Sequence, residues 1–530
     1  MPADTISITS VDVNLHNRNI IRPPRFDSAT LKRYFGSRVS SLFVTKEERA
    51  QFTWNEILNP FHSIHEVTLK QWNFFALGLC AWTWDAFDFF ATNLNVVAIS
   101  KELDRSVQDI TWGITLVLMF RSVGAVFMGI WADTRGRKWP YMCNLILLIV
   151  IQIGTGSVKT YEQFIAVRAL FGIAMGGLFG LCAAEALSDL PKNARGVLSG
   201  IFQEGYALGY LIAVIFQRAI ADTTSGGWRN IFYFSAGPPV IFIVWRFFTP
   251  ETDAYLRQKA QFEEKAMAKN SAIKEFRHEF GKALKQYWLI MIYCVFMMAG
   301  FNFMSHGSQD LYPTMLTSQL GYGPNKSTVT NVVANLGAIL GGFVFGHLSQ
   351  FIGRRLSILI ACLLGGAMIY PWAFIKNSGL NAGVFFLQAG VQGAWGVIPI
   401  HLNELAPPQF RSLVTGLSYQ LGNLASSASS TIEAKISKRF PIVNSEGTHT
   451  YDYSKTMAIF IACVFTYVML IVFFGPEYRG AALSVERDEV VSKYDSDGEY
   501  EAHVDAKSKE GSILEKTEAN HIEEEPAKAV

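Results

Sequence analysis

The chain has 530 residues, of which 50% are apolar and only 17% are charged, and its formal net charge at pH 7 is +2. So little charge excludes a soluble protein of this size, and apolar runs of about 20 residues recur, the length that spans a bilayer. The balanced charge gives no sign of nucleic-acid binding. We therefore expect a helical membrane protein that crosses the lipid bilayer many times.

Twelve apolar segments are long enough to be membrane-spanning helices. They are expected at about 72–98, 110–132, 139–157, 163–187, 196–218, 229–248, 287–311, 328–350, 355–375, 380–403, 412–434 and 455–475. The polar segment 251–286 separates six spans from six. Because it is charged and helix-prone, we expect a cytoplasmic linker helix there.

The predicted fold is therefore an all-α membrane protein with two pseudo-symmetric six-helix halves, 71–250 and 287–476. Residues 1–70 form a polar segment without a charged-then-apolar leader, so the first membrane helix is expected to act as its own insertion signal. Residues 477–530 are acidic and poor in aromatic residues, which is typical of a disordered tail.

The six cysteines all lie inside apolar runs, where they are expected to be small core residues. They form neither a disulfide pattern nor a zinc-binding spacing. No phosphate-binding loop or catalytic triad stands in a suitable context. We therefore expect no metal site and no cofactor.

The two halves resemble each other at an offset of close to 220 residues. The stretch GIWADTRGRK (129–138) follows the second span, and GHLSQFIGRR (346–355) follows the eighth. Likewise, Pro250-Glu251 after the sixth span matches Pro476-Glu477 after the twelfth. Parallel repeats of six helices are typical of transporters that bind their substrate between two rocking halves.

Basic residues predict the orientation, because cytoplasmic loops are rich in Lys and Arg. Most of them fall on the side of the linker and both termini, which we therefore expect to be cytoplasmic: Arg135, Arg137, Lys138, Lys192, Arg195, Arg354, Arg355 and Arg411. The loop after the eleventh span is an exception, with Lys435, Lys438 and Arg439 on the predicted outside. Asn325 begins a glycosylation sequon on that same side.

The stretch 129–138 resembles the loop signature of the major facilitator superfamily, and this resemblance covers about residues 70–480. It implies a secondary active transporter rather than an enzyme. Within the loop, Asp133, Arg135 and Arg137 are expected to pair with helix ends and to stabilise the state that is closed to the cytoplasm.

A narrower resemblance lies in NFMSHGSQDLYPT, residues 302–314. This stretch matches every specified position of N-x-x-[ST]-H-x-[ST]-Q-D-x-x-x-T, the pattern of the fungal Jen-type carboxylate:proton symporters. The matching residues are Asn302, Ser305, His306, Ser308, Gln309, Asp310 and Thr314. The resemblance implies a plasma-membrane protein whose partners are a small carboxylate, protons and regulators that act on the tail.

The matching residues share one helix face. Asn302, Ser305, His306, Gln309 and Asp310 fall within about 140° of the helix circumference. Lipid excludes such a polar face, so it is expected to line the bundle interior or a wet cavity. His306 and Asp310 are four residues apart and are expected to hold the transported proton, while Asn302 and Gln309 are expected to contact the substrate. The alternative is that these side chains only hydrogen-bond neighbouring helices.

A proline follows this face. Pro313 has no N–H group, so the carbonyl of Gln309 loses its usual donor and the helix is expected to bend there. A bending helix end that carries polar groups suits a gate, to which Ser305, Ser308, Pro313 and Thr314 are assigned.

Arg121 lies near the middle of the second span, where an arginine costs about 2.5–3.5 kcal/mol on insertion scales. Its planar guanidinium suits a carboxylate held by two parallel hydrogen bonds. The alternative is a permanent salt bridge to Asp85 or Asp88 of the first span. The Jen-type resemblance implies that Arg121 binds the substrate carboxylate.

Neutral polar residues complete the candidate site. Gln420 and Asn423 are three residues apart in the eleventh span, and the resemblance implies that this pair contacts the substrate. Such residues also hold helices together. Phe202 and Gln203 in the fifth span lie where the family selects among acids, although Phe202 is equally suited to packing.

Other intramembrane charges are expected to have a structural role. Arg168, Glu185 and Glu204 are interpreted as pairs within the first half. Glu433 and His401 receive no assignment.

The expected function is proton-coupled symport of short-chain carboxylic acids. The Jen-type resemblance implies a preference for dicarboxylates such as malate and succinate, because the dicarboxylate branch of that family has a Gln, here Gln203, beside the Phe of the fifth span. A primary amide offers two donors and an acceptor to a second carboxylate. Monocarboxylates such as lactate and pyruvate remain open, as does a monocarboxylate-only symporter. The alternative functions are a sugar carrier and a nutrient sensor that binds the acid without transporting it.

Overall fold

The structure is a computed structural model that describes residues 24–479, except residues 25, 45–48, 51, 192, 222, 254, 257–258, 261–271, 378, 408–409 and 444–448. The chain divides into two units, Met1–Asn17 with Ser484–Val530 and Arg18–Leu483, and every described residue belongs to the second. Residues 480–530 of the predicted tail, and residues 261–271 of the predicted linker, lie outside the described residues. The prediction that the disordered tail begins at residue 477 was wrong, because Glu477 and Arg479 are buried and hydrogen-bonded to the second half.

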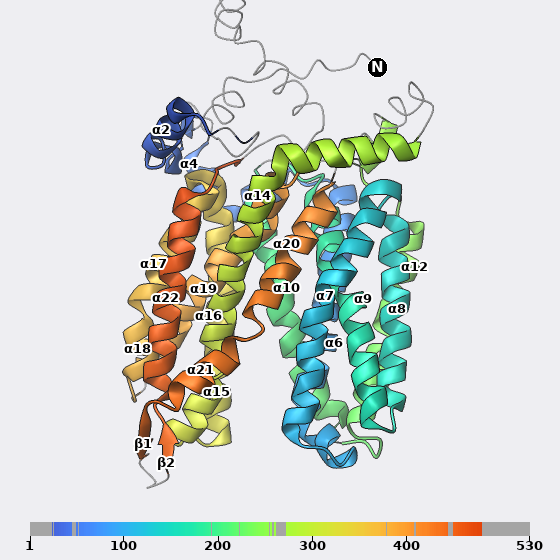
Figure 1. The fold of residues 1–530 in the computed structure, drawn as a ribbon, viewed down its shortest axis with the longest axis vertical. Helices are drawn as coiled ribbons and strands as arrows, with labels where there is room; N and C mark the ends of the chain where they lie inside the picture. The colour runs from blue at the N-terminus through green and yellow to red at the C-terminus, as the bar shows by residue number, and fades with distance from the viewer. Residues whose placement is uncertain are drawn as a thin grey trace, which may run out of the picture. The chain divides into compact units, whose positions relative to one another are not determined.

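The long helices form two groups that match the predicted halves (Figure 1). The first group is α6 (Leu69–Glu102), α7 (Val107–Arg135), α8 (Lys138–Ser157), α9 (Tyr161–Leu187), α10 (Arg195–Phe216) with η2 (Gln217–Ala221), α11 (Trp228–Ser235) and α12 (Pro238–Phe248). The second is α14 (Ala272–Gln309), α15 (Tyr312–Thr314) with η3 (Met315–Gln319), α16 (Pro324–Ile352), α17 (Arg354–Ala367), α18 (Ile369–Phe374), α19 (Gly379–Leu405), α20 (Arg411–Ser426), α21 (Ser429–Ser437) and α22 (Tyr453–Phe474).

The described residues contain ten helical segments that are long and apolar enough to cross a membrane. The two further spans that complete the predicted twelve correspond to α6 and to α20 with α21. Helix α6 carries Asp85, Asp88 and Asn95 among its apolar residues, and α20 is separated from α21 by Ser427 and Ala428. The arrangement is the predicted all-α fold.

Local sequence accounts for where several helices begin and break. Thr68 and Ser106 accept hydrogen bonds from the first turns of α6 and α7, and each forms a capping box. Pro238 starts α12 because a proline is tolerated in the first helical turn but not further inside a helix. The short hairpin of β1 (Pro441–Val443) and β2 (His449–Tyr451) pairs Ile442 with Thr450.

We call the end of the bundle that carries Gly136 and Gly353 the motif end, and the opposite end, with β1 and β2, the hairpin end. The two loops at the motif end repeat each other closely. Gly136 and Gly353 both have positive φ, 96° and 104°. The backbone N–H of Lys138 donates to Glu251 at 2.7 Å, and that of Arg355 donates to Glu477 at 2.9 Å. The internal repeat predicted from the sequence is therefore present in three dimensions.

The two halves are joined at the motif end. The carboxylate of Asp133 accepts hydrogen bonds from the backbone N–H groups of Ser412 (3.2 Å) and Leu413 (2.9 Å), at the N-terminus of α20 in the other half. A carboxylate is stabilising there because of the partial positive charge of a helix N-terminus. Arg137 donates to the carbonyl of Ala184 at the end of α9, whereas Arg135 is exposed at the end of α7.

Glycines allow the helices of the two halves to touch near this end. A Cβ atom added at Gly200 of α10 would collide with the carbonyl oxygen of Gly342 in α16. Within the first half, a Cβ atom at Gly176 of α9 would collide with the carbonyl oxygen of Arg121 in α7. Close backbone approach of this kind is how membrane helices gain packing contacts.

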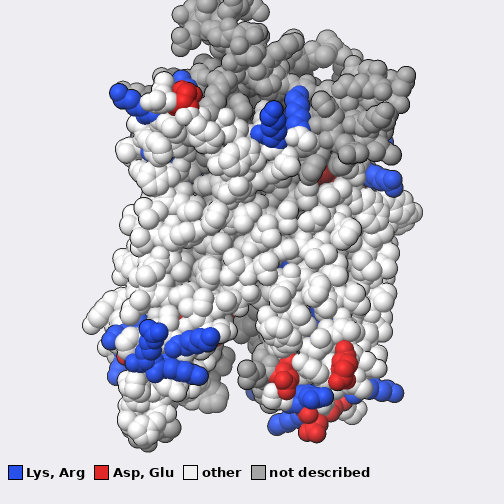
Figure 2. Space-filling view, in the orientation of Figure 1, with Lys and Arg blue, Asp and Glu red and all other residues white. Residues whose placement is uncertain are grey.

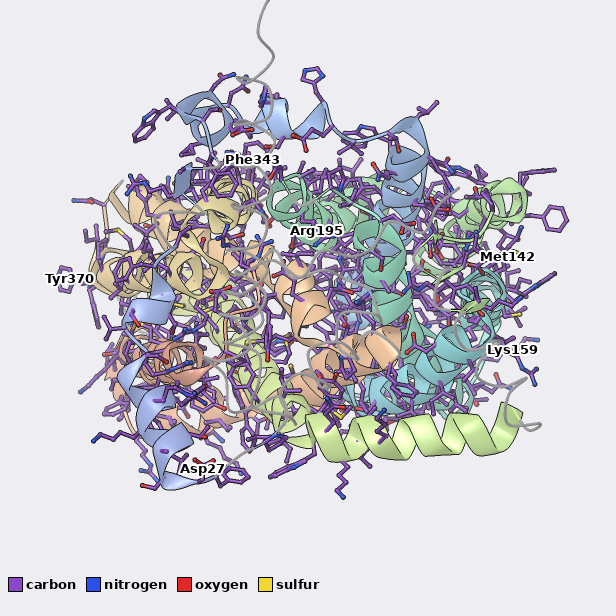
Figure 3. The ribbon with its side chains drawn as sticks, turned by 90° about the horizontal axis from the view of Figure 1, so that it is seen from above. Asp27, Met142, Lys159, Arg195, Phe343 and Tyr370 are labelled. Carbon is purple, nitrogen blue, oxygen red and sulfur yellow. The ribbon has the colours of Figure 1, made fainter. Side chains whose placement is uncertain are left out.

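The segment before α6 packs against the second half. It contains α2 (Ser28–Gly36), η1 (Ser40–Leu42), α4 (Trp54–Leu58) and α5 (Pro60–Ile64), which border the bundle when it is seen from the motif end (Figure 3). Arg38 donates to the carbonyl of Gly475 at 2.6 Å, and Arg355 donates to the hydroxyl of Ser41 at 2.9 Å. This segment therefore contacts the second half before the chain enters the first.

Replacement of Asp133 by alanine should weaken closure of the motif end by about 1–2 kcal/mol, because two backbone N–H groups lose a charged acceptor. Thiol labelling can measure this effect, because Ser199 of α10 is buried and donates to the carbonyl of Gly396 in the other half at 2.9 Å. We expect a Ser199→Cys side chain to react with a water-soluble thiol reagent several-fold faster when Asp133→Ala is added. Arg135→Ala is the matched control, and equal rates in all three proteins would contradict the role given to Asp133.

Candidate functional site

A cavity of about 210 Å³ lies between the two halves. Its wall comes from α10, α14, α15, α16 and α19, with Phe90 of α6. The space-filling view shows a cleft between the halves at the hairpin end (Figure 2). The motif end is closed by the contacts described above, so the cavity belongs to a state that is open toward the hairpin end.

Amide side chains are the largest group of polar residues in the cavity wall. The six that line the cavity are Gln203, Gln309, Asn331, Asn335, Gln388 and Gln392. Two carboxyl groups, Glu204 and Asp310, also line it, and no Lys or Arg is among the described lining residues. Such a wall offers many hydrogen-bond donors and acceptors without a fixed positive charge.

The predicted proton-holding pair is present at this wall. The Nδ1 atom of His306 lies 3.1 Å from Oδ2 of Asp310, in the predicted i, i+4 relation. The two side chains are 24% and 33% exposed, and Asp310 lines the cavity whereas His306 does not. The geometry allows one proton to be shared between them.

The helix that carries this pair is interrupted where the proline predicts it. Helix α14 ends at Gln309, and α15 begins at Tyr312 with Pro313 in its first turn. Asp310 is thus placed at a helix break, and its side chain and that of Pro313 both line the cavity. The side chain of Thr314 is half-buried and does not belong to the lining.

The other residues of this stretch divide into two groups. Gln309 donates to Gln388 of α19 at 3.1 Å, and Gln388 in turn donates to the hydroxyl of Ser308 at 3.3 Å. This network joins α14 to α19 along the cavity wall. Asn302, by contrast, is buried away from the lining and donates to the carbonyl of Met298 in its own helix. Ser305 is half-buried and also lies outside the lining.

Arg121 is buried, with 1% of its surface exposed. Its guanidinium lies 5.0 Å from the ring centroid of Phe89 and contacts the sulfur of Met175. Among the described residues, its Nε has no hydrogen-bond partner and no carboxylate lies within ion-pair distance of it. The permanent salt bridge to Asp85 or Asp88 is therefore not the arrangement found here.

The charge of Arg121 nevertheless acts on groups of several helices. Asp85 of α6, Tyr206 of α10, His306 of α14 and Tyr419 of α20 all interact with it electrostatically. Tyr206 lines the cavity. Arg121 thus lies behind the cavity wall, in the region where both halves contribute side chains.

The amide pair of α20 is hydrogen-bonded within the bundle. Gln420 donates to the carbonyl of Gly176 in α9 at 3.4 Å, and Asn423 donates to Gln420 at 3.3 Å. Because Gly176 packs directly against Arg121, this pair and the arginine share one neighbourhood. Neither amide lines the cavity in this state.

The two predicted selectivity residues of α10 point to different places. Gln203 lines the cavity, and its Oε1 has no hydrogen-bond partner among the described residues. Phe202 is fully buried outside the lining and stacks on Trp82, with ring centroids 6.4 Å apart. Trp82 stacks in turn on Tyr206, so Phe202 reaches the cavity only through other aromatic rings.

The predicted structural pairs within the first half are found in part. Glu185 forms a buried ion pair with Arg246 at 2.9 Å. Arg168 is hydrogen-bonded to Thr92 at 2.8 Å rather than to a carboxylate. The interpretation of Glu204 was wrong, because its side chain lies against Gly342 of the other half and lines the cavity.

Four amides of the lining were not recognised from the sequence: Asn331, Asn335, Gln388 and Gln392. A signal for them exists, since each pair is spaced by four residues and so shares one face of a membrane-spanning helix.

Comparison with known proteins gives a consistent result. The model of the family "Sugar (and other) transporter" matches residues 58–487. A "Carboxylic acid transporter protein homolog" of Saccharomyces cerevisiae is 40% identical over 493 residues, which cover 90% of this chain and 79% of that protein. A "Cis,cis-muconate transport protein" of Acinetobacter baylyi is 24% identical, over 64% of this chain and 81% of that protein.

The fold is also found among solved structures. The proton:xylose symporter XylE aligns with a TM-score of 0.65 at 14% identity, over 79% of this chain and 98% of that one. The chain therefore belongs to the sugar (and other) transporter family of the major facilitator superfamily, as a membrane transporter rather than an enzyme, and its predicted resemblance to the fungal Jen-type carboxylate transporters is confirmed.

Proposed function

We propose that the protein takes up short-chain carboxylic acids together with protons across the plasma membrane, with both termini in the cytoplasm and the hairpin end outside. Relatives whose names include carboxylic acid and muconate transport support a carboxylate as the substrate. The basic residues at the motif end support the orientation.

The observation that carries the proposal is the buried, unpaired guanidinium of Arg121. A cation inside a membrane protein is costly unless it is paired. Because no described carboxylate lies within ion-pair distance of Arg121, a substrate carboxylate can supply that pairing. The amides of the cavity would guide the acid toward Tyr206, which lines the cavity and interacts electrostatically with the arginine.

The cycle follows from the state that the structure describes. The acid and a proton enter from the hairpin end, where the cavity opens. Asp310 with His306 holds the proton, and the two halves then rock so that the motif end opens. Release of both to the cytoplasm completes the transfer.

A sugar carrier is the alternative suggested by the name of the family, and amide side chains also bind hydroxyl groups. A neutral sugar, however, would leave the guanidinium of Arg121 without a carboxylate at ion-pair distance among the described residues. A nutrient sensor that binds the acid without moving it is distinguished by flux alone, because only a transporter accumulates labelled substrate in vesicles.

Asp310→Asn should abolish accumulation of a labelled acid against its gradient, because the amide cannot carry the proton. Uptake into vesicles with an imposed pH gradient is the measurement, with the amount of protein in the membrane determined in parallel. Asp253→Asn, which removes a surface carboxylate paired with Lys70, is the matched control. Undiminished accumulation by Asp310→Asn would show that this carboxylate does not couple the proton.

Arg121→Lys should impair uptake nearly as severely as Arg121→Ala, because a point charge cannot reproduce a two-pronged contact with a carboxylate. The apparent affinity for the labelled acid is the quantity to compare. Arg229→Lys, a surface replacement of the same kind, should leave it unchanged. Near-normal affinity in Arg121→Lys would mean that the arginine acts through charge alone.

We further propose a preference for dicarboxylates, on the basis of the unpartnered Oε1 of Gln203 in the cavity wall. Excess succinate or malate should then block uptake of the labelled acid, and Gln203→Ser should weaken this block more than the block by lactate. Gln217→Ser is the control, since Gln217 is bonded to Asn95 and does not line the cavity. Strong inhibition by lactate with none by succinate would assign the protein to monocarboxylates.

A further inference from the structure

One carboxyl group of the cavity wall has no place in the cycle described above. Glu204 of α10 lines the cavity, yet only 9% of its surface is exposed. Its Oε1 has no hydrogen-bond partner, and no ion pair within the described part of the chain includes it. Glu185, a second buried carboxylate of the first half, is paired with Arg246, and the buried Asp85 and Asp88 of α6 do not line the cavity.

Glu204 lies at the contact between α10 and α16, which we call the joint between the halves. A Cβ atom added at Gly342 of α16 would collide with Oε1 of Glu204, so the absence of a side chain at Gly342 provides the space for the carboxyl group. Gly200, one helical turn before Glu204, touches the same glycine. Glu204 is therefore the residue of α10 next to the contact that must open when the halves rock.

Among the described residues that line the cavity around Glu204, none is a cation. On its own helix, Tyr206 and Tyr210 line the cavity, and α14 contributes Asp310, an acid. Helix α16 contributes Asn335, α19 contributes Gln388 and Gln392, and α6 contributes Phe90. An unpaired charge is strongly disfavoured in such a place. While α10 and α16 are in contact, the protonated form of the Glu204 carboxyl group is therefore favoured over the charged form.

We propose that Glu204 is a second proton-carrying group of the transport cycle. It takes a proton from water in the cavity and holds it while the motif end is closed. When α10 separates from α16, water reaches the carboxyl group, which passes the proton to that water and becomes a carboxylate. This inference rests on the proposed proton-coupled uptake, and it places one proton site at the moving contact in addition to the pair on α14.

The test uses the purified full-length protein in vesicles, with whichever of lactate, pyruvate, succinate and malate the wild type takes up. Glu204→Gln keeps the shape of the side chain but stays neutral. We expect exchange of labelled for unlabelled acid to continue, while accumulation, the number of protons moved per acid and the stimulation of uptake by external acid all fall. An unchanged pH profile with unchanged proton stoichiometry would overturn the proposal.

Gly342→Ala gives an independent test, because the nearest atoms to the added methyl group all belong to the Glu204 side chain. It should push the carboxyl group into the cavity and shift half-maximal uptake to more acidic pH, since a hydrated carboxyl group holds its proton less tightly. In the Glu204→Gln background the same change should have no further effect on the pH profile. Equal shifts in both backgrounds would contradict the proposal, and Gly366→Ala, which faces open space, is the control.

The outcome for this inference is separable from that of the proposed function. If the wild type moves no protons with the acid, the proposed function itself fails. If the wild type does so and Asp310→Asn abolishes accumulation, while both Glu204→Gln and Gly342→Ala keep the wild-type pH profile, only the role of Glu204 is refuted. If Glu204→Gln does not reach the membrane, Gly342→Ala decides.

Discussion

The contact between the two halves at the motif end is the constraint on which the rest of the described structure depends. Glycines let α10 touch α16, and Asp133 holds the N-terminus of α20 by two hydrogen bonds. Because the halves are joined there, the space between them lies toward the hairpin end, where the cavity is found. The solvent exposure of the residues in the cavity wall is therefore that of the state open toward the hairpin end. A residue at the contact between the halves becomes more exposed when that contact opens.

In a membrane protein, a buried charged group without a partner indicates a site where a ligand or a proton can bind. Glu185 lies 2.9 Å from Arg246, so each of these two buried charges has a partner of opposite sign within the first half. Arg121 and Glu204 are also buried, but neither forms an ion pair among the described residues. Burying a polar group without its partner costs free energy, and packing contacts alone do not offset this cost. Arg121 lies behind the cavity wall, where a substrate carboxylate would pair with it. Glu204 lies in the wall, where a bound proton would neutralise it.

The repeat explains the scaffold but not the chemistry. The turns at Gly136 and Gly353 and their bonds to Glu251 and Glu477 are nearly equivalent in the two halves. The candidate functional groups are not equivalent, because the buried arginine belongs to the first half and the pair on α14 to the second. Two similar halves can rock about a common centre. Only the differences between them place a buried cation in one half and the His306–Asp310 pair in the other.

The sequence by itself determined the helical membrane fold, the internal repeat, the helix break before Pro313 and the contact of His306 with Asp310. Each of these depends on local spacing or on composition, which a single chain displays directly. Only the tertiary structure decided which faces meet across the two halves. In the tertiary structure, Phe202 and Asn302 lie outside the cavity lining, whereas amides of α16 and α19 belong to it. Glu204 lies against the other half. The physical reason is that a polar residue in an apolar span must face away from lipid, but its spacing does not say whether it faces a neighbouring helix or the cavity.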